Sequence, residues 1–360
     1  MAIKAPIFAA KDAAYFCERI QQVISEPVNS SAVTVGLSSV IGFTLYPKES
    51  ASPSELIDQA VTAKRHARSI GRDQISAFKS NMGSESKERS ELGIDLQNAI
   101  ANDELQLHYQ LQVNTATGLI EGVESLLRWQ HPTKGFIPPD KFITIAEETD
   151  QISEIGDWVL DRACRDAVLW PAPYRVAVNV AGPQISDLEF PKKVLSKLLE
   201  VGLDPGRLEI EITETGIISD MAMATHIIRQ LKALGVCVAM DDFGTGYSSL
   251  STLKSLPFDK IKVDREFVKE IETDHYSEAI LKSTILLGNS LNIPVLAEGV
   301  ETLEQANMLT DLGCKSLQGF LFGRPVTNDQ LTEIAYGPQC LMECSSAVEE
   351  IEREPLKQAS

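Results

Sequence analysis

The chain has 360 residues, of which 43% are hydrophobic, enough for two or three ordinary domains or for one barrel and a smaller unit. Its formal net charge is −18, and the excess acid lies beyond residue 80: residues 1–80 hold nine basic and seven acidic side chains, and the remainder holds 24 and 44. Such a surface repels nucleic-acid polymers and anionic membranes, although a small anion can bind where cations reverse the local field.

We expect a cytoplasmic protein without a membrane span. The sequence contains no run of about 18 consecutive apolar residues, so no transmembrane helix is predicted. At the N-terminus, Lys11 and Asp12 leave too short an apolar stretch for a convincing secretory signal. Six cysteines are scattered along the chain, which is typical of reduced thiols in a reducing compartment.

The main domain boundary is predicted at the polar segment SNMGSES, residues 80–86, where the charge balance also changes. Residues 1–80 therefore form a first region. Helical spacing of apolar residues in 85–103 predicts a lead-in helix, so that 81–104 is assigned to a linker with this helix. The second region spans 105–336, and the tail at 337–360 is predicted to be a solvated helix followed by disorder.

Strand-like and helical segments alternate from residue 105 onward. Only residues 114–117 separate the first two strands, too few for a parallel crossover, so these strands should pair antiparallel. Eight strands with mostly helical connections over about 250 residues predict an α/β fold, namely a (β/α)8 barrel, with a doubly wound open sheet as the alternative. The predicted strands are 105–113, 118–129, 174–180, 207–213, 236–241, 259–264, 294–300 and 315–322, and the predicted helices are 151–169, 184–201, 219–234, 274–292 and 301–312.

Each predicted strand carries a polar residue within it or near its C-terminal end. Singly, each has an ordinary explanation; Glu209 and Glu211, for example, share one strand face and can simply be solvated. An open sheet would hold several of these groups far apart, whereas a closed barrel brings all strand ends to one pocket, which favours the barrel. The residues are Gln110, Glu124, Asn179, Glu211, Asp241 with Asp242, Lys262 with Asp264, Glu298 and Gln318.

Carboxylates gathered in this way repel one another unless a cation binds them. Carboxylate and amide oxygens suit Mg²⁺ or Mn²⁺, whereas zinc prefers Cys and His. The adjacent Asp241 and Asp242 can face a pair of metal ions about 3.5–4 Å apart, which would activate a water and stabilise charge on the attacking and leaving oxygens. Phosphodiester hydrolysis needs both effects, and Lys262 can position the water or neutralise developing charge.

The motifs of the predicted barrel region resemble those of a known protein family. The region from about residue 90 to residue 336 resembles the EAL-domain cyclic di-GMP phosphodiesterases, a family of bacterial signalling enzymes. The family signature, acid-Ala-Leu, appears as Glu124-Ser125-Leu126 within VESLLRWQHP. Further similar motifs, in family order, are YQ (109–110), VNV (178–180), EIEITE (209–214), DDFGTGYSSL (241–250), KIKVD (260–264), AEGVE (297–301) and QGFLFGRP (318–325).

The resemblance implies a TIM-like (β/α)8 barrel with one antiparallel strand, which uses two Mg²⁺ or Mn²⁺ ions to hydrolyse cyclic di-GMP to linear 5′-pGpG. Lys262 is similar to the lysine that orients the hydrolytic water, and it is implied to be catalytic together with Glu124 and Glu298. Glu214 matches a glutamate that anchors the loop after the paired aspartates. The implied ligands of the first metal are Glu124, Asn179, Glu211 and Asp241, those of the second are Asp241, Asp242 and Glu298, and the implied substrate contacts are Gln110, Arg128, Asp264 and Gln318.

The sequence departs from the family pattern at three places, where Ser125 replaces alanine, Leu111 replaces proline and Ala181 replaces serine. None removes an implied ligand, so a competent enzyme is expected. Residues 8–80 resemble the C-terminal half of a GGDEF domain. The half that carries the nucleotide loop is not recognisable before residue 30, so we predict a partial, degenerate GGDEF-like segment without cyclase activity.

Two other functions stay open. One is a catalytically silent cyclic di-GMP receptor, and the other is a barrel enzyme that stabilises an enolate with one metal. Retention of every implied acid favours the hydrolase over the receptor, and the paired aspartates argue against the enolate enzyme. By the same resemblance, the surface near the loop 243–250 is predicted to form a homodimer.

Overall fold

The structure, a computed structural model, describes residues 10–25, 28–29, 34–35, 38–46, 52–71, 73–218, 220–244 and 256–336. The chain divides into two compact units, Met1–Asn98 and Ala99–Ser360. The predicted tail 337–360 and residues 245–250 of the predicted loop lie outside the described residues.

The first unit is a small α/β unit. Strands β3 (Ile41–Phe43) and β4 (Ile75–Ala77) pair in parallel, and helix α2 (Pro53–Ile70) lies between them in the chain. α2 begins at a capping box, in which the side chains of Ser52 and Glu55 each accept a hydrogen bond from the other's backbone N–H. The other described elements are α1 (Ala10–Ser25), β1 (Val28–Asn29), β2 (Thr34–Val35) and α3 (Met82–Ala99). The relation of this unit to a GGDEF domain stays a prediction.

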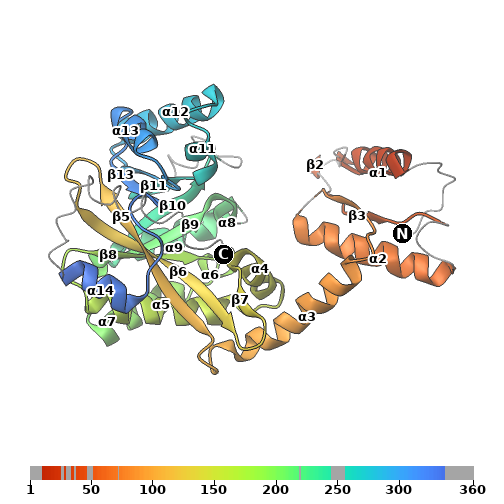
Figure 1. The fold of residues 1–360 in the computed structure, drawn as a ribbon, viewed down its shortest axis with the longest axis horizontal. Helices are drawn as coiled ribbons and strands as arrows, with labels where there is room; N and C mark the ends of the chain where they lie inside the picture. Colours follow the sequence, from red (N-terminus) through yellow and green to blue (C-terminus); the bar gives the residue numbers. More distant parts are fainter. Residues whose placement is uncertain are drawn as a thin grey trace, which may run out of the picture. The chain divides into compact units, whose positions relative to one another are not determined.

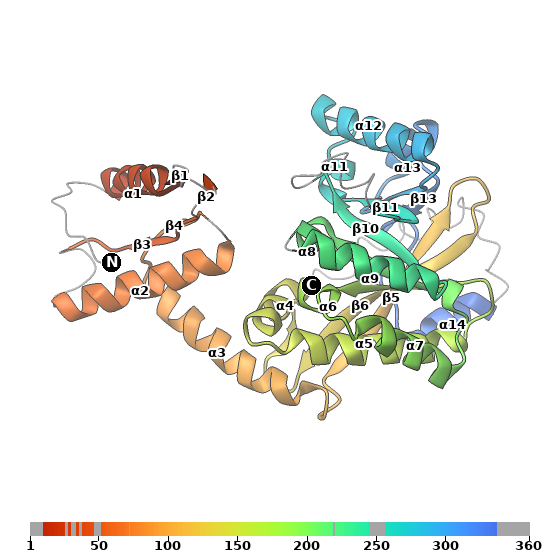
Figure 2. The same cartoon turned by 180° about the vertical axis from the view of Figure 1, so that it is seen from behind.

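Eight strands of the second unit close into a barrel (Figures 1 and 2). Their order around the ring is β5-β13-β12-β11-β10-β9-β8-β6, and β5 pairs with β6 to close it. The strands are β5 (Leu105–Asn114), β6 (Ile120–His131), β8 (Arg175–Val180), β9 (Leu208–Thr213), β10 (Cys237–Phe243), β11 (Lys260–Val263), β12 (Val295–Ala297) and β13 (Ser316–Gln318).

Closure of the ring by the β5–β6 pair confirms the predicted barrel and excludes the open sheet. β5 runs antiparallel to β6, as the short connection at 114–117 requires, and it is also antiparallel to β13. The other neighbouring pairs of the ring are parallel. Outside the ring, β7 (Gly135–Ile137) pairs antiparallel with the end of β6.

Helices connect most of the parallel strands and cover the outside of the barrel (Figures 1 and 2). α5 packs against β8, α9 against β10 and α12 against β12. No helix in the described ranges is long and apolar enough to cross a membrane. The helices are α4 (Pro139–Glu148), α5 (Ile152–Val168), α6 (Gly182–Ile185), α7 (Phe190–Val201), α8 (Glu214–Ile218), α9 (Met221–Ala233), α11 (Arg265–Lys269), α12 (His275–Leu291), α13 (Leu303–Asp311) and α14 (Asn328–Tyr336).

Two strands end earlier than the sequence pattern predicts. β12 stops at Ala297 and β13 at Gln318, and beyond these points the two backbones stay close, with the N–H of Val300 donating to the oxygen of Gln318 at 3.0 Å. A Cβ added to Gly319 would stand 2.0 Å from the carbonyl oxygen of Val300. The predicted site residues of both strands therefore lie at or directly after the strand ends. The predicted helix 184–201 is likewise divided into α6 and α7.

β9 shows why the barrel interior is polar. Leu208, Ile210 and Ile212 are fully buried, and Glu209 and Glu211 between them are 2% and 1% exposed. Since neighbouring side chains of a strand face opposite sides, the apolar three face the outer helices and the glutamates point into the barrel. Each buried aliphatic side chain contributes about 1.5–3 kcal/mol, which helps to offset the burial of charge inside. The interpretation of these glutamates as solvated groups is wrong.

Candidate active site

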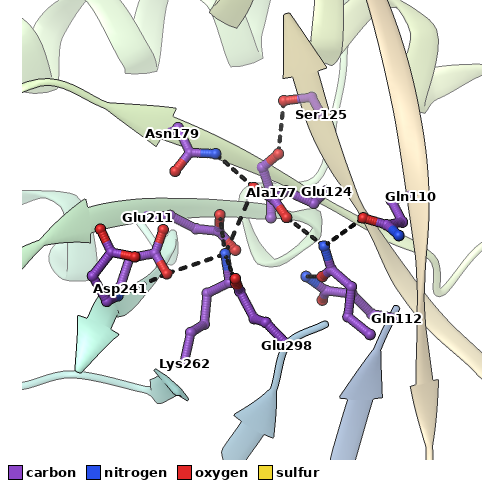
Figure 3. A network of polar contacts seen from close by, with 12 residues as sticks. Gln110, Gln112, Glu124, Ser125, Ala177, Asn179, Glu211, Asp241, Lys262 and Glu298 are labelled. Atoms are coloured by element: carbon purple, nitrogen blue, oxygen red, sulfur yellow. Dashed lines mark hydrogen bonds and ion pairs between the residues drawn. The ribbon is translucent and has the colours of Figure 1, made fainter. Parts of the chain in front are cut away.

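Lys262 stands at the centre of the polar residues inside the barrel (Figure 3). Its ammonium nitrogen Nζ lies 2.7 Å from Oε2 of Glu211 and 2.6 Å from Oε1 of Glu298. It also lies 3.4 Å from Oδ1 of Asp241 and 3.7 Å from Oε1 of Glu124. Four carboxylates, each from a different strand or strand end, thus converge on one fully buried cation.

Glu124 on β6 is held by two side-chain amides (Figure 3). Nδ2 of Asn179 donates to Oε1 of Glu124 at 2.7 Å, and Nε2 of Gln318 donates to Oε2. Gln318 also donates to Oε1 of Gln110 at 3.3 Å. The structure therefore brings the predicted residues of β5, β6, β8 and β13 into one hydrogen-bonded group.

Ser125, which replaces the alanine of the signature, does not disturb Glu124. As its neighbour on β6, it faces the other side of the strand and donates its hydroxyl to the backbone oxygen of Ala177 at 2.8 Å. Because alanine lacks this donor, the serine adds a contact between β6 and β8.

Asp241 and Asp242 are adjacent on β10, yet both line the same pocket. A register shift in the pairing of β10 with β11 falls at these residues, and such a bulge can re-aim side chains. Asp242 has a φ of +55°, a left-handed conformation that aspartate tolerates better than most residues, and its N–H donates to Oδ1 of Asp241 at 2.9 Å. The bulge explains how two neighbouring carboxylates can face one site.

Burial and mutual repulsion raise the pKa of most of these acids. Burial raises the pKa of Glu298 to about 8, although the charge of Lys262 partly opposes it. Burial, with the charges of Asp241 and Asp264, raises the pKa of Asp242 to about 6. Burial also holds the pKa of Glu211 well above its usual range. Protons or cations are thus needed to stabilise the group.

Glu124 and Lys262 are shifted towards their charged forms. Burial raises the pKa of Glu124, but the ammonium of Lys262 and the amides of Gln318 and Asn179 outweigh it, so the net shift is downward. Burial lowers the pKa of Lys262, but the surrounding carboxylates, led by Asp241, outweigh it and raise the pKa well above its usual value. Lys262 therefore stays protonated at neutral pH.

The residues fit a hard divalent cation. Their donor atoms are carboxylate and amide oxygens, the ligands that Mg²⁺ and Mn²⁺ prefer. Within the described residues, Oε1 of Glu211 is buried without a hydrogen-bond partner, as expected for an oxygen that awaits a ligand. No set of three or more described acids, cysteines or histidines is already spaced to hold an ion, and four of the acids instead lie around Nζ of Lys262.

A pocket of about 890 Å³ opens beside the acids. Its lining includes Asn179, Asp241 and Asp242, residues of β6 and α8, and residues of α4, α5 and α6. Among its described lining residues, Arg128 is the one basic side chain, and it is part-buried. The volume is in the range of pockets that enclose small-molecule ligands, about 300–1,000 Å³.

Other predicted site residues lie at the edge of this group. Gln110 is buried beside Gln318 and does not line the pocket. Asp264 accepts the N–H of Glu266 at 2.7 Å as the N-cap of α11, and its charge acts on Asp242. Glu214 is buried at the start of α8. Its loop-anchoring role stays a prediction, because the described part of that loop ends at Gly244.

Sequence reasoning missed a second polar group deeper in the barrel. Nζ of Lys260 lies 2.8 Å from Oε1 of Glu209 and 3.2 Å from Oε1 of Gln112, and all three residues are buried. Each of the three lies two positions from a predicted site residue on the same strand, and this shared face was the signal that could have revealed them.

Comparisons with known proteins agree with this geometry. The profile of the EAL domain matches residues 94–325. The chain is 42% identical over 324 residues to the bifunctional diguanylate cyclase/cyclic di-GMP phosphodiesterase MucR of Pseudomonas aeruginosa, covering 89% of this chain and 47% of that protein. It is 34% identical over 320 residues to the cyclic di-GMP phosphodiesterase NbdA of the same species, covering 88% and 41%. The chain thus spans less than half of these relatives.

Solved structures of proteins bound to cyclic di-GMP are also similar to this chain. The PaMucR phosphodiesterase in complex with c-di-GMP matches with a TM-score of 0.65 and 44% identity, over 67% of this chain and 99% of that one. A manganese and cyclic di-GMP complex of Klebsiella pneumoniae BlrP1 matches with a TM-score of 0.56 and 34% identity, over 62% and 56%. The closed barrel with one antiparallel strand, its acidic centre and the match over residues 94–325 lead to one conclusion: the chain belongs to the EAL domain family.

Proposed function

We propose that the chain is a metal-dependent phosphodiesterase that hydrolyses cyclic di-GMP to linear 5′-pGpG. The observation that carries the proposal is the convergence of four carboxylates on buried Lys262 beside the pocket. The similarity to MucR and NbdA, both named as cyclic di-GMP phosphodiesterases, supports the choice of substrate.

The proposed metal ligands are the oxygens of the acidic group. The first ion would be held by Glu124, Asn179, Glu211 and Asp241, and the second by Asp241, Asp242 and Glu298. When bound, a pair of Mg²⁺ or Mn²⁺ ions supplies an acidified water and positive charge at the attacking and leaving oxygens. The structure of the BlrP1 relative with manganese supports this choice of metal.

The side chains of the chain itself have distinct proposed roles. Lys262 stays protonated, so it serves as a hydrogen-bond donor to the attacking water and to the charge that develops on the phosphate, not as a base. Glu298, proposed as a ligand of the second ion, also lies 2.6 Å from Nζ of Lys262 and so helps to hold that ammonium in place. Arg128 in the pocket can pair with a phosphate of the substrate.

The bond changes follow from the product. The water oxygen bonds to phosphorus as the water gives up one proton to solvent, the bond from phosphorus to the 3′ oxygen breaks, and that oxygen takes up one proton from solvent water. The phosphate then remains on the 5′ carbon, which gives 5′-pGpG. Gln110, Gln318 and Asp264 are the remaining proposed substrate contacts.

Incubation of the purified chain with cyclic di-GMP and Mn²⁺ or Mg²⁺ tests the proposal, with pGpG measured by chromatography and mass spectrometry. We expect pGpG from the wild type and none above background from Glu124→Gln, which keeps the size of the side chain but removes its charge. Glu304→Gln, at an exposed position on α13, is the matched control and should retain full activity. Binding of cyclic di-GMP without any pGpG would instead establish the silent receptor.

The first unit is proposed to be part of a GGDEF domain without cyclase activity. The match to MucR extends over 324 residues, more than remain from residue 94 to the end of the chain, so it includes residues of the first unit. MucR is named as both a cyclase and a phosphodiesterase, which supports the assignment. The homodimer and the cytoplasmic location stay predictions, and light scattering of the active protein tests the first of them.

A further inference from the structure

We propose that Lys260, Glu209 and Gln112 form a positioning network that fixes the direction of the Gln318 side-chain amide and, through it, the orientation of Glu124. The three residues do not touch the pocket, so they act through other side chains. The inference deepens the proposed function, and only its catalytic consequence rests on that function.

The network occupies the layer of the barrel directly below the acidic group. Residues two apart on a strand share a face, so Lys260 points inward like Lys262, and Glu209 points inward like Glu211. Both lower residues are at most 6% exposed. Each network residue also pairs in register with a small residue, which leaves room for its side chain: Gln112 with Gly122, Glu209 with Ala177, and Lys260 with Ala239.

The ammonium of Lys260 determines the direction of the hydrogen bonds. An ammonium can only donate, so the Gln112 amide must present its oxygen to it, at 3.2 Å. The Gln112 nitrogen then faces Gln318 and donates to its Oε1 at 3.1 Å. Gln318 must therefore turn its own nitrogen towards Glu124, to which it donates. The ammonium of Lys260 thus determines which way round the side-chain amides of Gln112 and Gln318 are turned.

Reversal of this series of hydrogen bonds would disturb the orientation of Glu124. If the Gln318 amide turned over, its carbonyl oxygen would face the carboxylate, and an attraction to a charged group would become a repulsion. Glu124 would keep the bond from Asn179 but lose the second one that orients it. Glu209 completes the network, because its carboxylate compensates the charge of Lys260 at 2.8 Å and keeps the ammonium in place.

Gln112→Glu is the sharpest test, because it preserves the size of the side chain and its attraction to Lys260. The new carboxylate has no N–H to give, so the Gln318 amide must turn over to donate to it. We expect the melting temperature to fall by some degrees, because the variant adds a second buried carboxylate beside the single Lys260, so kcat and metal affinity are compared below the melting transition of each protein. We expect kcat for pGpG formation and the affinity for Mn²⁺ alone, measured by calorimetry, each to fall about tenfold or more, as for loss of a partner that orients a metal ligand.

Gln112→Met separates the effect of the lost amide donor from the effect of the charge that Gln112→Glu adds. This neutral variant also lacks the donor, so its kcat and Mn²⁺ affinity should fall in the same direction, by less than in Gln112→Glu. Lys260→Met combined with Glu209→Leu removes the fixed donor together with its counter-charge and should lower both quantities as well. Lys193→Met, which removes a lysine paired with Asp157 on the outer helices, should leave both unchanged.

The proposal is overturned if Gln112→Glu keeps wild-type kcat and Mn²⁺ affinity. It is also overturned if Gln112→Met and the double variant match the wild type while only Gln112→Glu is impaired, since the effect would then come from charge. If the wild type forms no pGpG, the proposed function fails, and the Mn²⁺ titrations alone decide the role of the network.

Discussion

The barrel interior holds two buried lysines that stand two residues apart on β11, and their surroundings differ. Lys262 faces four carboxylates within 4 Å, those of Glu124, Glu211, Asp241 and Glu298. Lys260 faces one carboxylate, that of Glu209, and the oxygen of one amide. The upper layer therefore carries a surplus of negative charge, whereas the lower layer is balanced.

The difference in charge distinguishes the layer of Lys262, which needs bound cations, from the layer of Lys260, whose charges already balance. A surplus of buried carboxylates is unfavourable unless protons or cations neutralise it, and the raised pKa of Glu211 and of Glu298 expresses that cost. A balanced pair with its hydrogen bonds satisfied needs nothing further. We therefore interpret the upper layer as the place where divalent cations bind, and the lower layer as its permanent support.

The largest expected effect comes from Lys262→Met. The variant should lose about 10²- to 10³-fold in kcat, the range for removal of an electrostatic stabiliser. It should nevertheless bind Mn²⁺ at least as tightly as the wild type, because the ammonium no longer competes for the carboxylates. Steady-state kinetics and calorimetry with Mn²⁺ measure the two quantities. A kcat within threefold of the wild type would contradict the role given to Lys262, and weaker Mn²⁺ binding would contradict the competition.

Removal of one lysine of the balanced layer should instead destabilise the fold. Lys260→Met leaves the carboxylate of Glu209 buried without its counter-charge, so we expect the free energy of unfolding to fall by about 3–5 kcal/mol. Lys260→Met combined with Glu209→Leu should recover most of this loss, because no charge stays unpaired. Urea denaturation of the two variants and the wild type measures the difference. Equal losses in the single and double variants would show that the pair is not coupled.

The closed barrel could be predicted because its evidence is distributed along the chain. A polar residue recurs near the end of each strand, and the short connection at 114–117 fixes the antiparallel pair. The convergence of Glu124, Glu211, Asp241 and Glu298 on Lys262 follows from closure alone, since the strand ends of a barrel face one centre.

The lower layer and the aim of Asp242 could not be predicted in the same way. Alternation of polar and apolar residues on a strand has the same form whether the polar face meets solvent or a barrel interior, so Glu209 was open to both interpretations. Asp242 faces the pocket because of a bulge and a positive φ, and both depend on how β10 meets β11. Such features arise from packing between strands, which a single sequence does not display.

The smallest of these effects, a pH dependence of stability, distinguishes the layers without any mutation. With metal removed by EDTA, Glu298 holds a proton in the folded state up to its pKa of about 8 but releases it above its ordinary pKa when unfolded. The folded state thus binds more protons in that interval, and the free energy of unfolding should fall as pH rises from about 6.5 to 8, with Glu298 alone contributing at most about 1.4 kcal/mol per pH unit. This window avoids His108, whose lowered pKa acts with the opposite sign at lower pH.

Mn²⁺ should reverse the trend, because the ion binds the deprotonated carboxylates and displaces their protons. The stabilisation by Mn²⁺ should therefore grow over the same pH range, as measured by urea denaturation with and without the ion. Glu298→Gln, which cannot titrate at this position, should reduce the slope in EDTA. A free energy of unfolding that stays level or rises in wild-type protein without metal would mean that the upper layer carries no surplus charge. The contrast between the two lysines would then lose its physical basis.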